Sequence, residues 1–229
     1  RICDQLDLSP DDHVLEIGCG WGGFALLAAT EYGCRVTGLT LSAEQAKFAR
    51  ARIAHAGLTD RIRVVEEDYR IHQGSYTRIA SIEMLEAIGE KQFPTYFAAI
   101  DRLLVPGGRA CVQTILVPDN RYDRYRKAPD WIEQYIFPGC LIPSLSALAH
   151  ASKKASALLL SEVHEIGPHY AETLKRWRES FDANIEEIRE LGYDERFVRT
   201  WHFYLTFCEA AFRTRALRDV QLTLRRPFE

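Results

Sequence analysis

The stretch "VLEIGCGWGGFALLAATEYGCRVTGLTLS", from Val14 to Ser42, decides the fold that we expect. It has the pattern of a strand, a turn rich in glycine, a helix and a second strand. Glycine lets the backbone adopt positive φ and approach a ligand closely. A tight turn alone needs one or two glycines, and this turn has four, at Gly18, Gly20, Gly22 and Gly23. The turn is therefore predicted to bind a ligand.

Strands and helices alternate along the chain. Segments with the composition of strands are residues 13–17, 35–39, 62–68, 78–84, 109–116, 158–167 and 219–226. Helices are predicted near residues 22–32, 42–56, 92–104, 169–191 and 195–215, and a turn at residues 106–108. Such alternation predicts an α/β fold with a doubly wound, mostly parallel seven-stranded sheet and helices on both of its faces.

The pattern changes after Val117, where residues 118–157 mix aromatic side chains, prolines and charges. We expect a helical, aromatic insertion after the fifth strand, on the side of the sheet where open α/β sheets bind ligands. The whole chain, residues 1–229, is interpreted as a single domain that contains this insertion and a late hairpin at the sheet edge. Because the first residue is Arg1 rather than Met, a further N-terminal segment is also expected.

Composition argues against several classes of protein. A net charge of −3 provides no general basic field for nucleic acid. No apolar run approaches the roughly 18–20 residues of a membrane span, and no signal peptide is recognisable. The cysteines and histidines lack the spacing of metal ligands, so we expect no metal site. Six cysteines in a chain of this size are expected to be reduced thiols of a cytosolic protein.

The register of the glycine turn indicates the kind of ligand. A dinucleotide site has the spacing G-x-G-x-x-G and an acid at the end of the second strand. Here the glycines follow a different spacing around Trp21, and the second strand ends at Thr40. Glu16 would repel a phosphate and favour a cation, which fits the sulfonium and amino groups of S-adenosylmethionine (SAM). A ligand-free turn and a nicotinamide site are the weaker alternatives.

Five segments carry a resemblance to a known family, and they are "VLEIGCGWGG", "VTGLTLSAEQ", "EEDYR", "SIEMLEAIG" and "YIFPGCLIPS". Together they resemble the cyclopropane-fatty-acyl-phospholipid synthase family, which includes the mycolic acid methyltransferases. The resemblance runs from about Val14 to the C-terminus, and "GLTLS" and "YIFPG" are specific to this group. It implies the Rossmann-like fold of class I SAM-dependent methyltransferases.

The resemblance implies a set of cofactor-binding residues. The glycine turn would hold the methionine part of SAM, residues 40–45 would contact the nucleoside, and residues 68–69 would flank the adenine. The full set is Glu16, Gly18, Gly20, Gly22, Thr40, Leu41, Gln45, Asp68, Tyr69 and Ile82. Two members have a competing interpretation. Gln45 fits a capping box that begins at Ser42, and Asp68 would otherwise be a solvated loop acid.

Glu86 is the residue that the resemblance places closest to the chemistry. In the family this Glu, with a Cys, a His and a Tyr, holds a bicarbonate ion that acts as the base. Tyr170 matches the Tyr, Gln113 stands in place of the His, and the Cys belongs to a segment upstream of this chain. A glutamine NH₂ donates hydrogen bonds as an imidazole N–H does, but it does not titrate near neutral pH. The base is expected to be Glu86 itself or an anion that Glu86 positions.

Aromatic residues are expected to bind the acyl chain and to stabilise a carbocation on it. The substrate-binding candidates are Tyr135, Phe137 and Tyr204, and each alone would otherwise be a packing residue. Basic residues lie beside Tyr122 and Tyr125, at Arg121, Arg124, Arg126 and Lys127. They suit anionic lipid headgroups and equally a solvated helix face.

The leading hypothesis is a SAM-dependent C-methyltransferase. It would act on the double bond of unsaturated acyl chains of phospholipids and yield a cyclopropane, methylene or methyl-branched product. The enzyme would be cytoplasmic and peripherally membrane-associated, with a homodimer and a partner reductase as further expectations. The alternatives are an N-methyltransferase of a small amine and a catalytically inactive module that binds SAM or membranes.

Overall fold

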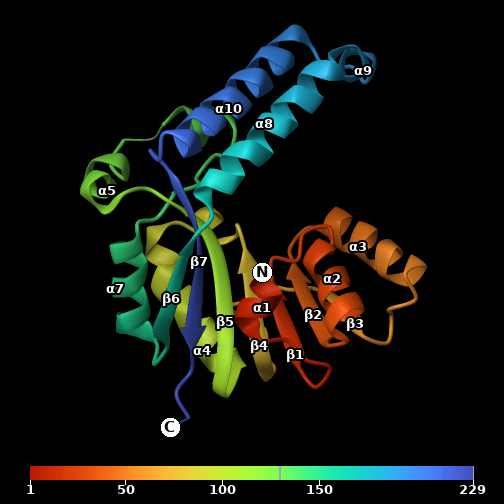
Figure 1. The fold of residues 1–229 in the computed structure, drawn as a ribbon, viewed down its shortest axis with the longest axis vertical. Coiled ribbons are helices and arrows are strands. Elements are labelled where there is room, and N and C mark those ends of the chain that lie inside the picture. The colour runs from red at the N-terminus through yellow and green to blue at the C-terminus, as the bar shows by residue number, and fades with distance from the viewer. Residues whose placement is uncertain (129, 229) are drawn as a thin grey trace. The chain divides into compact units, whose positions relative to one another are not determined.

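The computed structural model describes residues 1–128 and 130–228 (Figure 1). Its strands form a seven-stranded sheet in the order β3-β2-β1-β4-β5-β7-β6. The strands are β1 (His13–Ile17), β2 (Arg35–Thr40), β3 (Ile62–Glu66), β4 (Tyr76–Ile82), β5 (Leu104–Leu116), β6 (Leu159–Glu165) and β7 (Arg218–Arg225). This order confirms the predicted doubly wound α/β fold.

Most of the sheet is parallel. β1 pairs in parallel with β2 and with β4, β2 pairs with β3, and β4 pairs with β5. β6 and β7 run antiparallel. Ser161 Oγ donates to the carbonyl of Thr223 and the Ile166 N–H donates to the carbonyl of Asp219, so the residue numbers rise along β6 as they fall along β7. The expected edge pair is present, with β6 outermost, but helices rather than a tight turn connect its two strands.

The helices are α1 (Ile2–Leu6), α2 (Gly23–Tyr32), α3 (Ala43–His55), η1 (Leu85–Ala87), η2 (Glu90–Gln92), α4 (Phe93–Leu103), α5 (Asp119–Tyr125), α6 (Trp131–Tyr135), α7 (Leu145–Ala155), α8 (Gly167–Ala183), α9 (Ile185–Glu190) and α10 (Glu195–Arg213). The chain consists of two compact units, and the helices and strands are distributed between them. The first contains residues 1–114, 146–164 and the chain from Gln221 on, and the second contains residues 115–145 and 165–220. Nowhere in residues 1–128 and 130–228 is a helix long and apolar enough to span a membrane.

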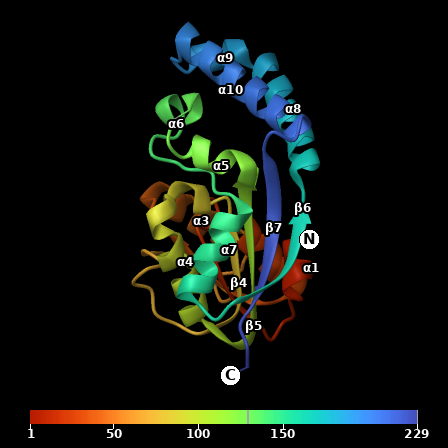
Figure 2. The same ribbon diagram turned by 90° about the vertical axis from the view of Figure 1, so that its left-hand side faces the viewer.

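In the first unit, one face of the sheet packs against α1, α2 and α3. Their small and aliphatic side chains form one buried cluster with Val14, Val36, Ala80 and Cys111 of the strands. Side chains alternate between the two faces of a strand, so Leu15 and Ile79 point to the opposite face. Figure 2 shows α4 and α7 on that side. The sheet is thus covered on both faces, as its continuous apolar strands require.

Two helices show why the sequence folds as it does locally. α2 presents Ala25, Ala28 and Ala29 to the core, and such short side chains allow close packing on the sheet. α4 places large side chains at helical spacing on its buried side, and they are Phe93, Tyr96, Phe97, Ile100 and Leu103. This spacing of apolar residues makes one continuous buried stripe.

The predicted turn at residues 106–108 is wrong, because these residues lie within strand β5. The Gly107 N–H donates to the carbonyl of Arg226, and the Arg226 N–H donates to the carbonyl of Gly108. The end of the chain therefore pairs with these residues and makes them part of the strand, although Gly107 itself has a φ of +76°. On the β4 side the register shifts between Tyr76 and Arg78, which pair with Leu104 and Arg109. The glycines are accommodated in this irregularity.

The second unit is built from helices. α8 and α10 pack against each other around a buried cluster that includes Leu174, Leu205 and Phe212. The predicted helix at residues 169–191 is two helices, α8 and α9, that meet at Asn184. The Asn184 side chain donates to the carbonyl of Ser180 and competes with the helical pattern there. α5 and α6 belong to this unit, whereas α7 groups with the first unit.

Burial of the core residues predicts how their substitution changes the free energy of unfolding. Ile79 is fully buried (0% exposed), whereas Ile71 is 67% exposed. Ile79→Ala is expected to lower the free energy of unfolding by about 2–5 kcal/mol, because it leaves a cavity in the packed core. Ile71→Ala is the matched control and should change it by less than about 0.5 kcal/mol. Urea unfolding followed by circular dichroism measures both, and equal losses would contradict this description of the core.

Candidate functional site

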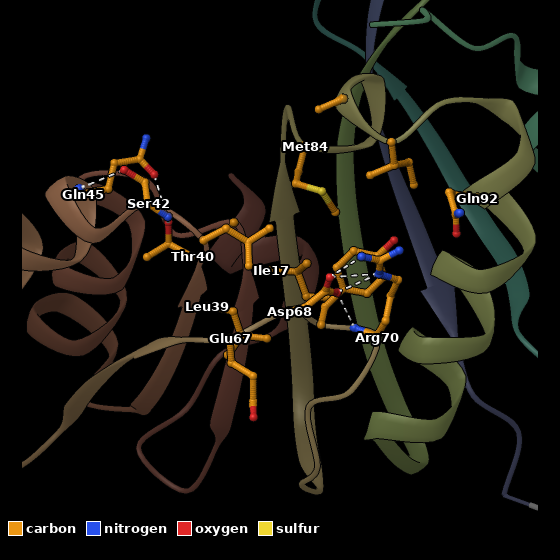
Figure 3. Close-up of a pocket in the computed structure, with 15 residues that line it drawn as sticks. Ile17, Leu39, Thr40, Ser42, Gln45, Glu67, Asp68, Arg70, Met84 and Gln92 are labelled. Atoms are coloured by element: carbon orange, nitrogen blue, oxygen red, sulfur yellow. Dashed lines mark hydrogen bonds and ion pairs between the residues drawn. The ribbon is translucent and has the colours of Figure 1, made fainter. Parts of the chain in front are cut away.

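A cavity of about 580 Å³ opens in the first unit where β1, β2, β3 and β4 end (Figure 3). Its walls come from these strand ends and the loops after them, from the start of α3 and from the short helices that follow β4. The lining residues are Ile17, Gly18, Leu39, Thr40, Leu41, Ser42, Gln45, Glu67, Asp68, Tyr69, Arg70, Met84, Ala87, Ile88 and Gln92. Of the predicted cofactor residues, six lie in this wall and are Gly18, Thr40, Leu41, Gln45, Asp68 and Tyr69.

The glycine turn closes one side of the cavity. Gly18 has φ +82°, and a Cβ on it would lie 3.0 Å from Cγ of Met84. The N–H groups of Gly18 and Cys19 both donate to the carbonyl of Leu39, at 3.0 and 2.8 Å. The turn after β1 is therefore tied to the end of β2, and only glycine leaves room for Met84 beside it.

Four predicted cofactor residues lie outside the lining: Glu16, Gly20, Gly22 and Ile82. Gly22 has a packing role, because a Cβ there would come within 3.1 Å of Cβ of Ala49 on α3. Ile82 ends β4 and pairs with Gln113 of β5.

Glu16 lies beneath the glycine turn and is 3% exposed. Burial raises the pKa of its carboxyl well above the usual range, and a hydrogen bond from the Ala25 N–H opposes this shift. Its Oε2 atom is buried and has no hydrogen-bond partner within the part of the chain that the structure describes. A polar acceptor thus remains available below the turn.

A chain of hydrogen bonds shapes the wall after β2. The Thr40 hydroxyl donates to Oε1 of Gln45 at 3.0 Å and accepts from the Ser42 N–H at 3.1 Å. Ser42 caps α3, because its Oγ accepts from the Gln45 N–H. The first half of the predicted capping box is therefore confirmed. The Gln45 side chain reaches Thr40 and lines the cavity (Figure 3), so the capping motif and a role in the site coexist.

Asp68 and Arg70 form an ion pair at the wall after β3. Arg70 Nε lies 2.9 and 3.0 Å from the two carboxylate oxygens of Asp68. The hydrogen bond from the Arg70 side chain is the main cause that lowers the pKa of Asp68. The Asp68 side chain is only 19% exposed, so the interpretation as a solvated loop acid does not hold. Tyr69 packs edge-on against Tyr96, and burial raises its pKa.

A buried network below Glu67 was not anticipated from the sequence. His72 Nδ1 is hydrogen-bonded to Oε2 of Glu67, and His72 Nε2 lies 2.7 Å from the hydroxyl of Tyr76. Arg102 of α4 donates to the His72 carbonyl at 2.7 Å. These bonds fix the loop that carries the cavity residues 67–70. Glu67, His72 and Tyr76 are close in the sequence but form no recognised motif, and Arg102 is 30 residues from His72.

Glu86 lies in η1, between the cavity residues Met84 and Ala87. Its Oε1 accepts from the Thr114 hydroxyl at 2.7 Å, and Thr114 is fully buried. Burial raises the pKa of the neighbouring Tyr96, and the charge of Glu86 adds to this shift. The carboxylate that the resemblance singles out is thus held by a residue of β5, and Glu86 itself is not among the residues that line the cavity.

Gln113 is held at both ends of its amide. Its Nε2 donates to Oε1 of Glu83 at 3.0 Å, and its Oε1 accepts from Nε2 of Gln221 at 3.0 Å. Neither Glu83 nor Gln221 was predicted to belong to the site. Their separation from Gln113, by 30 and 108 residues, hides the pairing from sequence inspection.

The remaining predicted residues belong to the second unit. Tyr170 packs against Phe212 and Trp177, with ring centroids 4.8 and 6.0 Å away. Phe137 and Tyr204 meet edge-on at 6.0 Å. Tyr135 contacts Trp131 at 5.7 Å and is 60% exposed. The three predicted substrate residues therefore share this aromatic unit.

The basic residues near α5 are exposed, but the tyrosines beside them are not. Tyr122 is 7% exposed, and the Tyr125 hydroxyl accepts from the Ile142 N–H at 3.3 Å. Arg126 pairs with Asp123. All six cysteines are free. Across residues 1–128 and 130–228, no three His, Cys, Asp or Glu side chains are grouped so as to hold a metal ion.

The fold and the cavity define a Rossmann-like class I methyltransferase fold with its site at the carboxyl ends of the first four strands. Residues 1–222 match the family described as mycolic acid cyclopropane synthetase, and the chain belongs to this family.

Two curated relatives and two solved structures illustrate the similarity. The chain is 41% identical to tuberculostearic acid methyltransferase UfaA1 of Mycobacterium tuberculosis, over 98% of this chain and 52% of that protein. It is 39% identical to cyclopropane-fatty-acyl-phospholipid synthase of Escherichia coli K12, over 96% of this chain and 54% of that protein. The chain thus spans about half the length of these relatives.

Among solved structures, the mycolic acid cyclopropane synthase CmaA1 complexed with SAH and CTAB superposes with a TM-score of 0.90 at 28% identity. The cyclopropane synthase MmaA2 from Mycobacterium tuberculosis superposes with a TM-score of 0.89 at 27% identity. Each similarity covers 98% of this chain and 81% of the other chain. The described fold is therefore that of the cyclopropane synthases.

The ion pair at the cavity makes a prediction about pH. Arg70→Met is expected to raise the pKa of Asp68 towards its ordinary value, because the main cause of its low pKa is removed. A carboxyl group whose pKa is lower in the folded state than in the unfolded state stabilises the folded protein at pH values above its unfolded-state pKa. This contribution is lost as the pH falls through the folded-state pKa. Arg70→Met should therefore be less sensitive to acid over that range.

Carboxyl ¹³C NMR titration of Asp68 measures the effect. Arg63→Met, which removes an exposed cation from β3, is the control and should leave the titration unchanged. An unchanged Asp68 pKa in Arg70→Met would contradict the assigned ion pair.

Proposed function

We propose that the chain carries the activity of a SAM-dependent C-methyltransferase acting on the double bond of unsaturated fatty acyl chains of phospholipids. The observation that carries the proposal is the cavity over the Gly18 turn, with Glu86 in the short helix η1 that contributes Ala87 to the lining. The product would be a cyclopropane, a methylene group or a methyl branch. All of these begin with the same methyl transfer.

The residues of the cavity fit SAM. A volume of about 580 Å³ lies within the range of about 300–1,000 Å³ typical of small-ligand sites. The position of Gly18 lets the backbone approach a ligand, and the buried Oε2 of Glu16 offers an acceptor below it. Thr40 and Gln45 offer hydroxyl and amide groups for a ribose, and Asp68 and Tyr69 offer a carboxylate and a ring for an adenine.

When bound, SAM supplies a methyl group already activated on a sulfonium. An alkene is a weak nucleophile, so the protein must mainly align it with the methyl group and exclude water. We propose that Tyr135 and Phe137, in a lipid-binding insertion at residues 118–157, bind the acyl chain together with Tyr204 of α10. Their faces would stabilise a developing carbocation by about 0.5–2 kcal/mol each.

A base then removes a proton from the acyl chain. A proton taken from the new methyl group leads to ring closure, and one taken from a neighbouring carbon leads to an alkene that a partner reductase would saturate. The base is a carboxylate of this chain, with Glu86 as the first candidate, or a bicarbonate ion held by protein groups. The resemblance adds Gln113 and Tyr170 to that set.

The names of the relatives support this proposal. They refer to fatty acid and phospholipid substrates in UfaA1 and the E. coli synthase. The CmaA1 structure was obtained with SAH. We extend these properties to the present chain as a proposal. We further propose that the enzyme is cytoplasmic, meets its substrate peripherally at a membrane surface and forms a homodimer.

A direct assay tests the proposed function. The protein is incubated with methyl-labelled SAM and mixed phospholipid vesicles, and the released fatty acids are analysed by mass spectrometry. We expect label in fatty acids that gain one carbon and retain one unsaturation equivalent. Label found only in water-soluble amines would refute the lipid substrate. Binding of SAM without any transfer would indicate an inactive module.

Glu86→Gln tests the catalytic assignment in the same assay. The substitution keeps the size of the side chain and removes its charge, so turnover should fall about 100-fold or more. Binding of S-adenosylhomocysteine, followed by calorimetry, should be preserved. Glu31→Gln, at an exposed position of α2, is the control and should remain fully active. Unchanged turnover in Glu86→Gln would remove Glu86 from the mechanism.

A further inference from the structure

The orientation of the Gln113 amide is set by a neighbour on the next strand. Gln221 of β7 is 5% exposed, and its Nε2 donates to Oε1 of Gln113. The carbonyl side of the Gln113 amide therefore faces Gln221, and its NH₂ side faces Glu83. The donor that the resemblance assigns to a bicarbonate ion is directed to a carboxylate of the protein itself.

Glu83 has an unusual backbone for a residue at the end of a strand. Its φ is +54°, in the left-handed region that residues other than glycine rarely adopt. Among residues 1–128 and 130–228, the other non-glycine residues with positive φ are Asp7 and Arg215, which both follow the end of a helix. A hydrogen bond from the Glu83 N–H to the Gln113 carbonyl, at 3.0 Å, holds this conformation. Such strain is concentrated at functional sites.

Glu83 belongs to the turn after β4 that also supplies lining residues of the cavity. It precedes Met84, which lines the cavity and is the residue that a Cβ on Gly18 would strike. Glu83 and Glu86 are held by successive residues of β5, Gln113 and Thr114. Successive side chains of a strand point to opposite faces of the sheet. The two carboxylates therefore have different surroundings, and Glu86 is bonded to a fully buried hydroxyl.

We propose that the Glu83 carboxylate is the proton acceptor, and that it takes the position of the bicarbonate ion expected from the resemblance. This inference rests on the proposed function and selects one of its two candidate kinds of base. An ionised carboxylate is an acceptor and matches the N–H of Gln113. A bicarbonate ion at this point would have to compete with the Glu83 carboxylate for the N–H that Gln113 already donates to it.

After methyl transfer the acyl chain carries a carbocation. A C–H bond of the new methyl group, or of a neighbouring carbon, breaks. Its electron pair forms the last C–C bond of the cyclopropane or a C=C bond, and the proton passes to a Glu83 oxygen. The neutral carboxylic acid then releases the proton to water, which restores the charged form.

The first experiment does not depend on activity. NMR spectra of ¹³C-bicarbonate are recorded with the wild type and with Glu83→Ala. We expect no specific binding to the wild type, and binding to Glu83→Ala, because that variant vacates the anion position beside Gln113. Specific binding of bicarbonate to the wild type would overturn the proposal.

The second experiment measures turnover with labelled SAM and phospholipid vesicles. Glu83→Gln should bind S-adenosylhomocysteine normally, which shows that it is folded, while turnover falls about 100-fold or more. Turnover of Glu83→Ala should be partly restored by added bicarbonate, whereas the wild type should be indifferent to it. Glu162→Gln, an exposed residue of β6, is the control and should stay active. Normal turnover of Glu83→Gln would overturn the assignment.

The two experiments separate this inference from the proposed function. If the wild type transfers no methyl group to lipid, the proposed function fails. The bicarbonate spectra then still decide whether Glu83 fills the anion position. If the wild type is active only with added bicarbonate, the proposed function stands and the assignment of Glu83 is overturned.

Discussion

The site depends on one backbone constraint, the left-handed conformation of Gly18 at the end of β1. Two successive N–H groups of this turn bind the carbonyl of Leu39, so the ends of β1 and β2 are fixed to each other. The same conformation brings the chain up against Met84, which follows β4. The turn at Gly18 thus contacts the chain at the ends of both strands that neighbour β1. A side chain at Gly18 would disturb these contacts.

Around this turn, polar contacts within the loops and between distant segments hold the cavity wall. The loop after β3 is fixed from below by the Glu67–His72–Tyr76 network and by Arg102 of α4. The turn after β4 is fixed by Gln113 and Thr114 of β5. A preorganised wall of this kind suits a reaction whose main requirement is alignment of a weak nucleophile. It also places two carboxylates, Glu83 and Glu86, at one turn, where Gln113 and Thr114 hold them separately.

Much of the fold could be predicted from the sequence, because apolar runs, helical spacing and glycines are local signals. The strand that ends at Ile17, the glycine turn and the Ser42 cap were read correctly. Residues 106–108 were misread, because their pairing partner Arg226 lies more than one hundred residues away. Glu83 was not predicted for the same reason, since its hydrogen bonding depends on Gln113 and Gln221, which are distant in the sequence. Long-range pairing of polar side chains leaves no local pattern.

The most direct test of this account is calorimetric titration with S-adenosylhomocysteine. The wild type should show saturable binding of one ligand per chain. Gly18→Ala should bind about tenfold or more weakly, because alanine is strained at φ +82° and its Cβ would press on Met84. Gly57→Ala, with φ +67° and open space around it at the end of α3, has comparable strain away from the cavity and should bind normally. Absence of binding to the wild type, or equal affinity in Gly18→Ala, would contradict the account.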